Sequence, residues 1–224
     1  NSFLIQTDSD GAAPTTGTLS SANNNLGIGN SVFSVLTSGS LNVCLGHQSG
    51  STVTSGANNT SLGALSAISA TANNQTAIGY EATCDAAHQI TLGNSSVTAL
   101  RCADTTIASL SDQRDKTNIV DSSYGLSFIN TLRPVQFTWQ RRDLQQGDVT
   151  SSYNGKTRLG FIAQELQAAM PNNENDILDL VYDVNPERIE AKYGKLIPIL
   201  TKAVQELSAA NYALVARVAA LESA

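Results

Sequence analysis

Leu26-Gly27-Ile28-Gly29 is the first of five short phrases that recur along the first half of this 224-residue chain. The four later phrases are Val43-Cys44-Leu45-Gly46, Thr60-Ser61-Leu62-Gly63, Thr76-Ala77-Ile78-Gly79 and Ile90-Thr91-Leu92-Gly93. Each ends in an aliphatic residue followed by glycine, and the closing glycines lie 17, 17, 16 and 14 residues apart. A nearly constant period of this size is typical of repeat proteins, in which each unit stacks on its neighbours.

These repeats predict a β-solenoid. Each unit has one apolar strand segment that is too short to bury itself, so we expect stacking to align one residue per unit as a continuous core row. That row comprises Ile28, Leu45, Leu62, Ile78 and Leu92. The glycine that follows each of them lets the backbone turn where a Cβ would clash. Small neighbours such as Ser61 and Ala77 leave room for only a thin core, and we therefore expect three chains to share one interior.

The regular aliphatic-glycine phrase argues against the alternative reading of this half as a low-complexity linker rich in Ser, Asn and Thr. Over roughly residues 20–100 the repeats resemble the head repeats of trimeric autotransporter adhesins. The resemblance implies a trimeric left-handed parallel β-roll. We expect this half to contact a cell-surface receptor, either a glycan or a protein.

The composition of the chain changes near residue 110. Residues 1–110 carry six of the 32 charged side chains (13 basic, 19 acidic), eleven of the 16 glycines and three of the 12 aromatic residues. We therefore divide the chain into residues 1–110, the fibre half, and residues 111–224. A formal net charge of −6 argues against nucleic-acid binding, and a charged fraction of 14% is too low for a disordered acidic chain.

Four phrases follow one another in the second half. They are Ser111-Asp112-Gln113-Arg114-Asp115-Lys116, Leu132-Arg133-Pro134-Val135-Gln136-Phe137, Leu159-Gly160-Phe161-Ile162-Ala163-Gln164-Glu165 and Tyr193-Gly194-Lys195-Leu196-Ile197-Pro198. In this order they resemble the C-terminal intramolecular chaperone domain of phage tail fibres and tailspikes, of the endosialidase type, over residues 111–224. The resemblance implies a trimeric α+β chaperone that helps an upstream β-rich fibre to fold. In many members of the family the domain then cuts itself off as a serine endopeptidase.

The same resemblance implies a catalytic pair. Ser111 corresponds to the nucleophile and Lys116 to the general base, and the bond that would be cut is Leu110–Ser111, at the change in composition. A lysine acts as a base only when burial or cationic neighbours lower its pKa. Arg114 is near enough in sequence to help, whereas Asp112 would oppose it. The alternative to self-cleavage is an adhesin tip that keeps the domain and binds its target uncleaved.

The last part of the chain, about residues 193–222, predicts a long helix with a coiled-coil face. The a positions are Ile197, Val204, Asn211 and Val218, and the d positions are Leu200, Leu207, Leu214 and Leu221. Pro198 has to lie near the start of this helix, and Asn211 would fix the register at some cost in stability. Val or Ile at a with Leu at d favours dimers. The family resemblance implies a trimer, which the fibre half also favours, so we expect a homotrimer.

Residues 126–170 predict a helix, a break at Pro134, a strand, and a later strand that runs into a helix ending at Met170-Pro171. Val135, Phe137 and Trp139 alternate, so they should share one face of the first strand. For Gln164 and Glu165 we expect helix capping or hydrogen bonding between subunits rather than catalysis.

The remaining signals predict neither a cofactor nor a metal. His47 and His88 have no partner at ligand spacing. For Cys44, Cys84 and Cys102 we expect small buried apolar residues, with a trimer-linking disulfide as the alternative.

No run of residues approaches the ~18 apolar positions of a membrane span, and no signal peptide is visible. The chain opens at Asn1 without a methionine, so we expect a C-terminal fragment of a longer protein. The location that fits is a virion tail fibre or an extracellular bacterial surface fibre.

Overall fold

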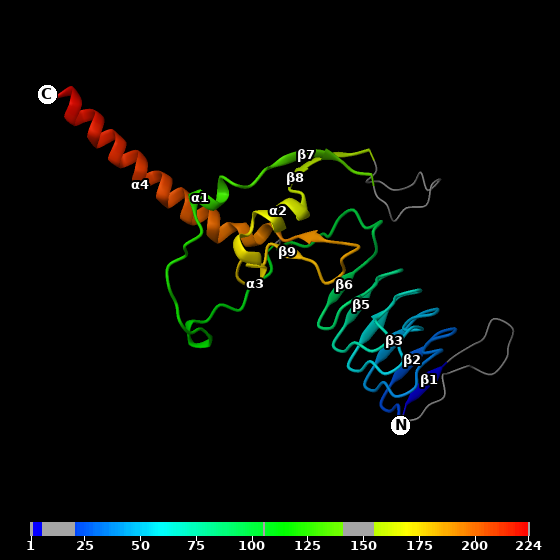
Figure 1. Ribbon diagram of the computed structural model, residues 1–224. Coiled ribbons are helices and arrows are strands. Elements are labelled where there is room, and N and C mark those ends of the chain that lie inside the picture. Colours follow the sequence, from blue (N-terminus) through cyan, green and yellow to red (C-terminus); the bar gives the residue numbers. More distant parts are fainter. Residues whose placement is uncertain (1, 6–20, 105, 141–154, 224) are drawn as a thin grey trace. The chain divides into compact units, whose positions relative to one another are not determined.

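The computed structural model describes residues 2–5, 21–104, 106–140 and 155–223 (Figure 1). The chain forms two compact units, which follow each other in sequence between Leu100 and Arg101. The sequence analysis placed the boundary between the two halves after residue 110, ten residues beyond this division. That boundary stays a prediction.

The first unit is a β-solenoid with one short strand in each coil (Figure 1). The strands are β1 (Phe3–Ile5), β2 (Leu26–Ile28), β3 (Val43–Leu45), β4 (Thr60–Leu62), β5 (Thr76–Ile78) and β6 (Ile90–Leu92). Each strand pairs with the next in parallel, so the sheet order is the chain order. The predicted solenoid is therefore confirmed, and the five phrases contain its strands β2 to β6.

The expected core row does align, but it lies on the outer face of the sheet. Ile28 pairs with Leu45, Leu45 with Leu62, and so on to Leu92. Ile28 and Ile78 are each 40% exposed and Leu92 is 53% exposed, so the assignment of this row to the interior was wrong. Successive side chains of a strand point to opposite faces, so a three-residue strand buries either its middle residue or its two ends. In β2 to β5 the middle residue is buried.

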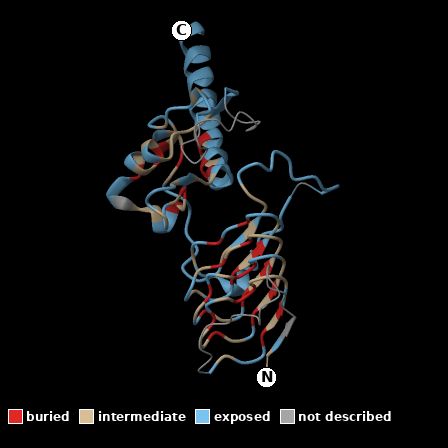
Figure 2. Ribbon diagram, turned by 90° about the vertical axis from the view of Figure 1, so that its right-hand side faces the viewer, coloured by how far each residue is buried: buried red, intermediate tan, exposed pale blue. Residues whose placement is uncertain are grey.

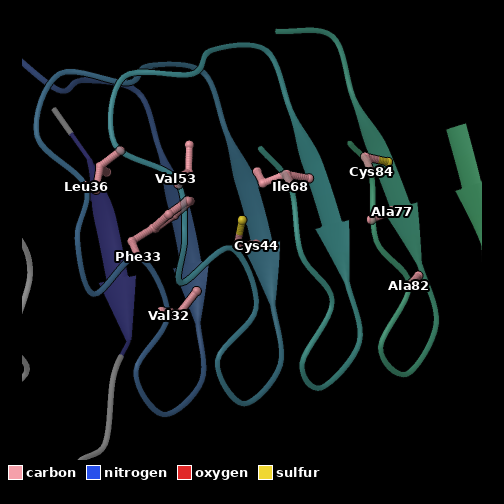
Figure 3. Packing of buried hydrophobic residues seen from close by; sticks show 9 residues of the cluster. All are labelled: Val32, Phe33, Leu36, Cys44, Val53, Ile68, Ala77, Ala82 and Cys84. Atoms are coloured by element: carbon pink, nitrogen blue, oxygen red, sulfur yellow. The ribbon is translucent and has the colours of Figure 1, made fainter. Parts of the chain in front are cut away.

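The interior is narrow because the inward strand residues are small. They are Gly27, Cys44, Ser61 and Ala77. The larger apolar side chains come from the turns, and Figure 3 shows Phe33, Leu36, Val53 and Ile68 within the coils. Cys44 and Cys84 are buried, as expected, whereas Cys102 is exposed.

Four of the five closing glycines have the role that the sequence indicated. Gly46 has a φ of +131°, and a Cβ there would lie 2.6 Å from the carbonyl carbon of Gly63 in the next coil. Gly29, Gly63 and Gly79 share this left-handed backbone. Side chains are thus excluded where successive coils approach most closely.

A ladder of buried amides runs through the solenoid, and the sequence analysis missed it. Asn25, Asn42, Asn59 and Gln75 each stand immediately before a strand and are at most 2% exposed. The Oδ1 atom of Asn42 accepts the backbone N–H of Asn59 at 3.0 Å, and its Nδ2 donates to the carbonyl of Gly56 at 2.9 Å. The same pair of bonds recurs at Asn25, so the ladder satisfies buried backbone groups along the stack.

The second unit is an α+β domain with two small antiparallel sheets. Its elements are η1 (Gln113–Asp115), α1 (Leu126–Ile129), β7 (Val135–Thr138), β8 (Thr157–Gly160), α2 (Ala163–Ala169), η2 (Pro171–Asn173), α3 (Asn175–Leu178), β9 (Val181–Tyr182), β10 (Glu190–Ala191), η3 (Tyr193–Lys195) and α4 (Leu196–Glu222). β7 pairs with β8, and β9 with β10. The predicted helix, break, strand and second strand-to-helix passage are confirmed.

The core of this unit joins α1, α2, α3 and the start of α4. Phe128, Leu166, Leu178 and Ile199 are among its buried side chains. A carboxylate oxygen of Glu206, on α4, accepts the backbone N–H of Leu126 at 2.8 Å, at the start of α1. Pro198 is the third residue of the 27-residue helix α4, at the position expected.

Candidate functional site: the segment around Ser111

The residues around Ser111 form a tight turn that a side chain stabilises. Asp112 precedes the short helix η1, and its Oδ1 accepts the backbone N–H of Arg114 at 2.9 Å. The backbone N–H of Lys116 donates to the carbonyl of Gln113 at 3.1 Å and closes the turn. The chain is thereby folded back so that position 116 lies beside position 111.

This turn brings the two residues of the expected catalytic pair into contact. The Nζ atom of Lys116 lies 2.5 Å from the Oγ atom of Ser111 and 3.3 Å from its carbonyl oxygen. The two atoms are in direct hydrogen-bond contact, which is the contact that a general base needs in order to remove a proton from a hydroxyl. The arrangement places the amine of Lys116 in contact with the hydroxyl of Ser111, a possible nucleophile, next to the Leu110–Ser111 peptide bond.

The neighbouring charges compensate each other. The guanidinium of Arg114 forms a two-pronged ion pair with the carboxylate of Asp112, with its Nη2 at 2.6 Å and its Nε at 3.0 Å. The hydrogen bonds from Arg114 hold the pKa of Asp112 below its usual value, and Asp112 in turn raises the pKa of Arg114. The sequence analysis expected Arg114 to help Lys116 act as a base and Asp112 to oppose this. In the structure Arg114 and Asp112 bind each other instead.

The segment is exposed in the single chain. Ser111 and Lys116 are both exposed, and Leu110 has the full exposure of an extended side chain, at 101%. Ile119 and Val120, just after the turn, are 64% and 85% exposed. The single chain therefore leaves both the pair and the apolar residues around it open to water.

A second feature of this unit is an apolar hollow of about 340 Å³ beside α2, lined by Leu132, Phe161, Ile162 and Leu166 among others. Arg133 and Glu165 form an ion pair at this hollow, and Glu165 raises the pKa of Arg133. Glu165 thus binds an arginine of its own chain, a role the sequence analysis did not foresee, although both residues stood in the quoted phrases.

Metal binding has no candidate site in the parts of the chain described, since no three His, Cys, Asp or Glu side chains gather there. Nor does any described helix combine the length and the hydropathy needed to cross a membrane.

The segment that begins at Ser111 matches the model of a known protein family. The model of the family described as chaperone of endosialidase matches residues 111–173, beginning at Ser111 itself. The match supports an endosialidase-type chaperone domain, the class that the four phrases indicated, and it takes in the first three of them. A β-solenoid followed by such a domain fits a fibre that carries its own chaperone domain, in a phage tail fibre context.

The comparisons with curated proteins and with solved structures found no match to the chain. The family match does not extend to the repeats, so their likeness to adhesin heads stays a prediction.

Proposed function

We propose that this chain is part of a homotrimeric fibre in which residues 111–224 nucleate the trimer and so guide the folding of the solenoid. The single observation that carries the proposal is an apolar face in each of the two units that is exposed among the described residues. One is the outer face of the solenoid sheet, and the other is a stripe along α4.

The outer face of the sheet supports a shared interior between three chains. Its two rows hold only aliphatic residues and threonine in the coils from β2 to β6, with no charge. One row is the misassigned core row, and the other runs through Leu26, Val43, Thr60, Thr76 and Ile90. Full burial of each aliphatic side chain contributes roughly 1.5–3 kcal/mol, so joining such faces is strongly favourable.

The helix α4 supports the same assembly. Its predicted a and d residues are exposed, from 44% at Leu200 and Val218 to 72% at Leu221. The residues that α4 buries against its own unit, Leu196, Ile199 and Ala203, lie on a different face. The heptad stripe is therefore free for neighbouring copies, as in a coiled coil.

Short parallel strands need such help in folding. Each coil offers a three-residue strand with a similar neighbour one coil away, so shifted pairings between chains cost little. Helices that assemble first hold three chains together. The solenoids then pair at a high effective concentration and no longer have to find each other in solution.

Self-cleavage at Leu110–Ser111 is the second part of the proposal. Lys116 takes the Oγ proton of Ser111 while Oγ attacks the carbonyl carbon of Leu110. The proton passes to the amide nitrogen of Ser111, the C–N bond breaks, and the Leu110 acyl group is left as an ester on Oγ. Water then hydrolyses the ester, giving a Leu110 carboxylate and a Ser111 hydroxyl with a free amino group. Exclusion of water from the lysine falls to the neighbouring copies of the trimer, since the single chain leaves it exposed.

The test is intact-mass analysis of freshly purified protein. We expect fragments that end at Leu110 and begin at Ser111, and full-length chain from Ser111→Ala and Lys116→Ala. Hydroxylamine should trap the ester as a hydroxamate on Leu110. Wild type that stays intact for days would instead favour an uncleaved adhesin tip, which the exposure of Ser111 and Lys116 in the single chain also fits.

The chaperone role is tested separately by deleting residues 111–224. The remaining residues should fail to form a soluble trimer, and a soluble trimer from them would contradict the role. Within the fibre we assign binding of a cell-surface glycan or protein to the solenoid, whose turns are rich in Asn, Ser and Thr. Binding of the purified fibre to whole cells, and its loss when solenoid coils are removed, checks this assignment.

A further inference from the structure

One corner of the solenoid carries an exposed aromatic side chain. Buried residues lie inside the coils in Figure 2, and exposed residues mark many of their turns. The residue after each closing glycine begins such a turn, and these residues form a column comprising Asn30, His47, Ala64, Tyr80 and Asn94. Tyr80 is 58% exposed. Its equivalent in the preceding coil is Ala64, whose single methyl group covers little of a neighbouring ring.

Two polar side chains fix Tyr80 in place, and we call Tyr80, Glu81 and Asn94 the Tyr80 cluster. A hydrogen bond from the Tyr80 hydroxyl to the carboxylate of Glu81 raises the pKa of Tyr80. The Oε2 atom of Glu81 also accepts the side-chain N–H of Asn94 at 3.3 Å, and the Oδ1 of Asn94 accepts the backbone N–H of Ser96 at 2.9 Å. A ligand that binds these side chains therefore has little of their conformational freedom left to remove.

The charges of the coils exclude an anionic ligand. Residues 21–100 contain Glu81 and Asp85 but neither Lys nor Arg. Proteins bind carboxylates and phosphates mainly through the cationic side chains of Arg and Lys. An anionic sugar at the Tyr80 cluster would meet the like charge of Glu81 without a cation to offset it. The cluster therefore suits a ligand without negative charge.

A neutral pyranose offers the groups that the Tyr80 cluster can bind. The ring of Tyr80 provides a large rigid surface for the C–H face of a sugar, and exposed aromatic rings with a polar end are typical of binding surfaces. An ionised carboxylate has about four lone-pair sites, and Tyr80 and Asn94 use two of those of Glu81. Sugar hydroxyls can donate to the others, in hydrogen bonds that the negative charge strengthens.

We propose, resting on the receptor binding assigned to the solenoid, that the Tyr80 cluster binds a neutral hexopyranose of a cell-surface glycan. The sugar stacks on the ring of Tyr80 and donates a hydroxyl hydrogen bond to Glu81, while Asn94 positions the carboxylate. The cluster lies beyond the end of β5 and within one chain, so it takes no residue from the two rows assigned to the trimer.

The site is tested by saturation-transfer NMR on the full chain, with Ser111→Ala to keep it intact. The neutral probes are the methyl glycosides of glucose, galactose, mannose and N-acetylglucosamine, and the anionic probe is the methyl glycoside of N-acetylneuraminic acid. We expect transfer to one face of at least one neutral sugar and none to the anionic sugar. Transfer to no neutral sugar, or transfer to the anionic sugar as strong as to a neutral one, would overturn the proposal.

Substitutions then locate the bound sugar. Tyr80→Ala should raise its dissociation constant by about ten-fold, whereas Tyr80→Phe keeps the ring and should raise it by no more than about three-fold. Glu81→Gln should raise it by about five-fold, because the acceptor loses its charge. Tyr212→Ala removes a tyrosine of α4 that is 75% exposed, and this matched control should leave the constant unchanged. Equal constants for wild type and Tyr80→Ala would overturn the site.

Binding of the purified fibre to whole cells separates this site from the function on which it rests. If Tyr80→Ala binds cells as well as wild type does, the site is wrong and the receptor role of the solenoid stands. If the sugar binds at Tyr80 but the fibre binds no cells, the site stands and the receptor role is wrong. Loss of cell binding in Tyr80→Ala without transfer to any sugar would assign the cluster to a protein receptor and overturn the glycan.

Discussion

At the scale of single residues, Asp112 has two roles beside the proposed scissile bond. Its carboxylate caps the η1 turn through the N–H of Arg114, and it also neutralises the guanidinium of the same residue. The cap stabilises the turn that brings Lys116 beside Ser111, so we assign Asp112 the role of a positioning residue in the proposed self-cleavage.

Substitutions at Asp112 should separate these two roles. We expect Asp112→Ala, which removes the cap, to slow self-cleavage at least ten-fold, and Asp112→Asn, which keeps an acceptor oxygen, to slow it much less. The depressed pKa of Asp112 means that the carboxylate cap is complete above its ordinary value of about 4 and is lost as the pH falls through the lower, folded value. A time course of cleavage by mass spectrometry at several pH values measures both effects. If the alanine variant cut as fast as wild type across that range, the positioning role would be wrong.

Leu41 is a residue under backbone strain. The position two residues before each strand from β2 to β6 has left-handed backbone, with φ between 54° and 60°, and it is occupied by Asn24, Leu41, Asn58, Asn74 and His88. A leucine is poorly suited to this conformation, whereas asparagine tolerates it. Leu41 is also 54% exposed, so its side chain contributes little to packing within the chain.

Replacing Leu41 by asparagine should therefore stabilise the solenoid by about 0.5–1 kcal/mol. Leu41→Ala is the control, since it removes the same apolar side chain but keeps the strain, and it should give no gain. Thermal unfolding of the full chain measures both. An asparagine variant no more stable than the alanine variant would show that the strain is not the cause.

At the scale of elements, the amide ladder connects coils that the three-residue strands alone hold weakly. Asn42 bonds to the coils on both sides of it, through Asn25 in one direction and through Asn59 and Gly56 in the other. Its removal would leave a buried N–H and a buried carbonyl without partners.

We expect Asn42→Ala to lower the free energy of unfolding by about 3 kcal/mol, because each unsatisfied buried group costs roughly 1–3 kcal/mol. Asn23→Ala removes an exposed side-chain amide that donates to the carbonyl of Ser21, and it should change the free energy by less than about 0.5 kcal/mol. The shift of the guanidinium midpoint compares the two variants directly. Equal shifts would mean that the ladder is not what joins the coils.

The elements also show where reading the sequence succeeds and where it stops. The period located every strand from β2 to β6, and the heptads located α4, because spacing along the chain is a local property. The sequence analysis assigned the wrong row of side chains to the interior of the solenoid. A three-residue strand has too few alternating residues to show which face points inward. The amide before each phrase was visible in the sequence, yet its bonds reach the next coil and depend on stacking. Likewise, the pairing of Asp112 with Arg114 follows from a turn that the residue types alone did not predict.

At the scale of the whole molecule, the proposed order of events is assembly first and cleavage second. Before the cut, each solenoid is tethered to a nucleating helix, which gives the strands of three chains an effective concentration in about the millimolar range. After the proposed cut, we expect the solenoid trimer to keep its structure only through slow unfolding, because nothing then directs its refolding. The yield of refolding should therefore depend on whether the chain has already been cut at Leu110–Ser111.

This dependence gives a prediction for refolding. Ser111→Ala protein, unfolded in guanidinium and diluted, should recover trimeric solenoid in good yield, because the nucleating helix is still covalently attached. Wild type that has been cleaved, treated identically, should refold poorly and aggregate, since its exposed apolar rows meet without register. Adding separately purified residues 111–224 to the cleaved sample is the control. It supplies the same surfaces without the tether, so it should not restore the yield. Equal recovery from cleaved and uncleaved protein would mean that the solenoid finds its own register, and the chaperone role would then have to be given up even if the cut at Leu110–Ser111 is observed.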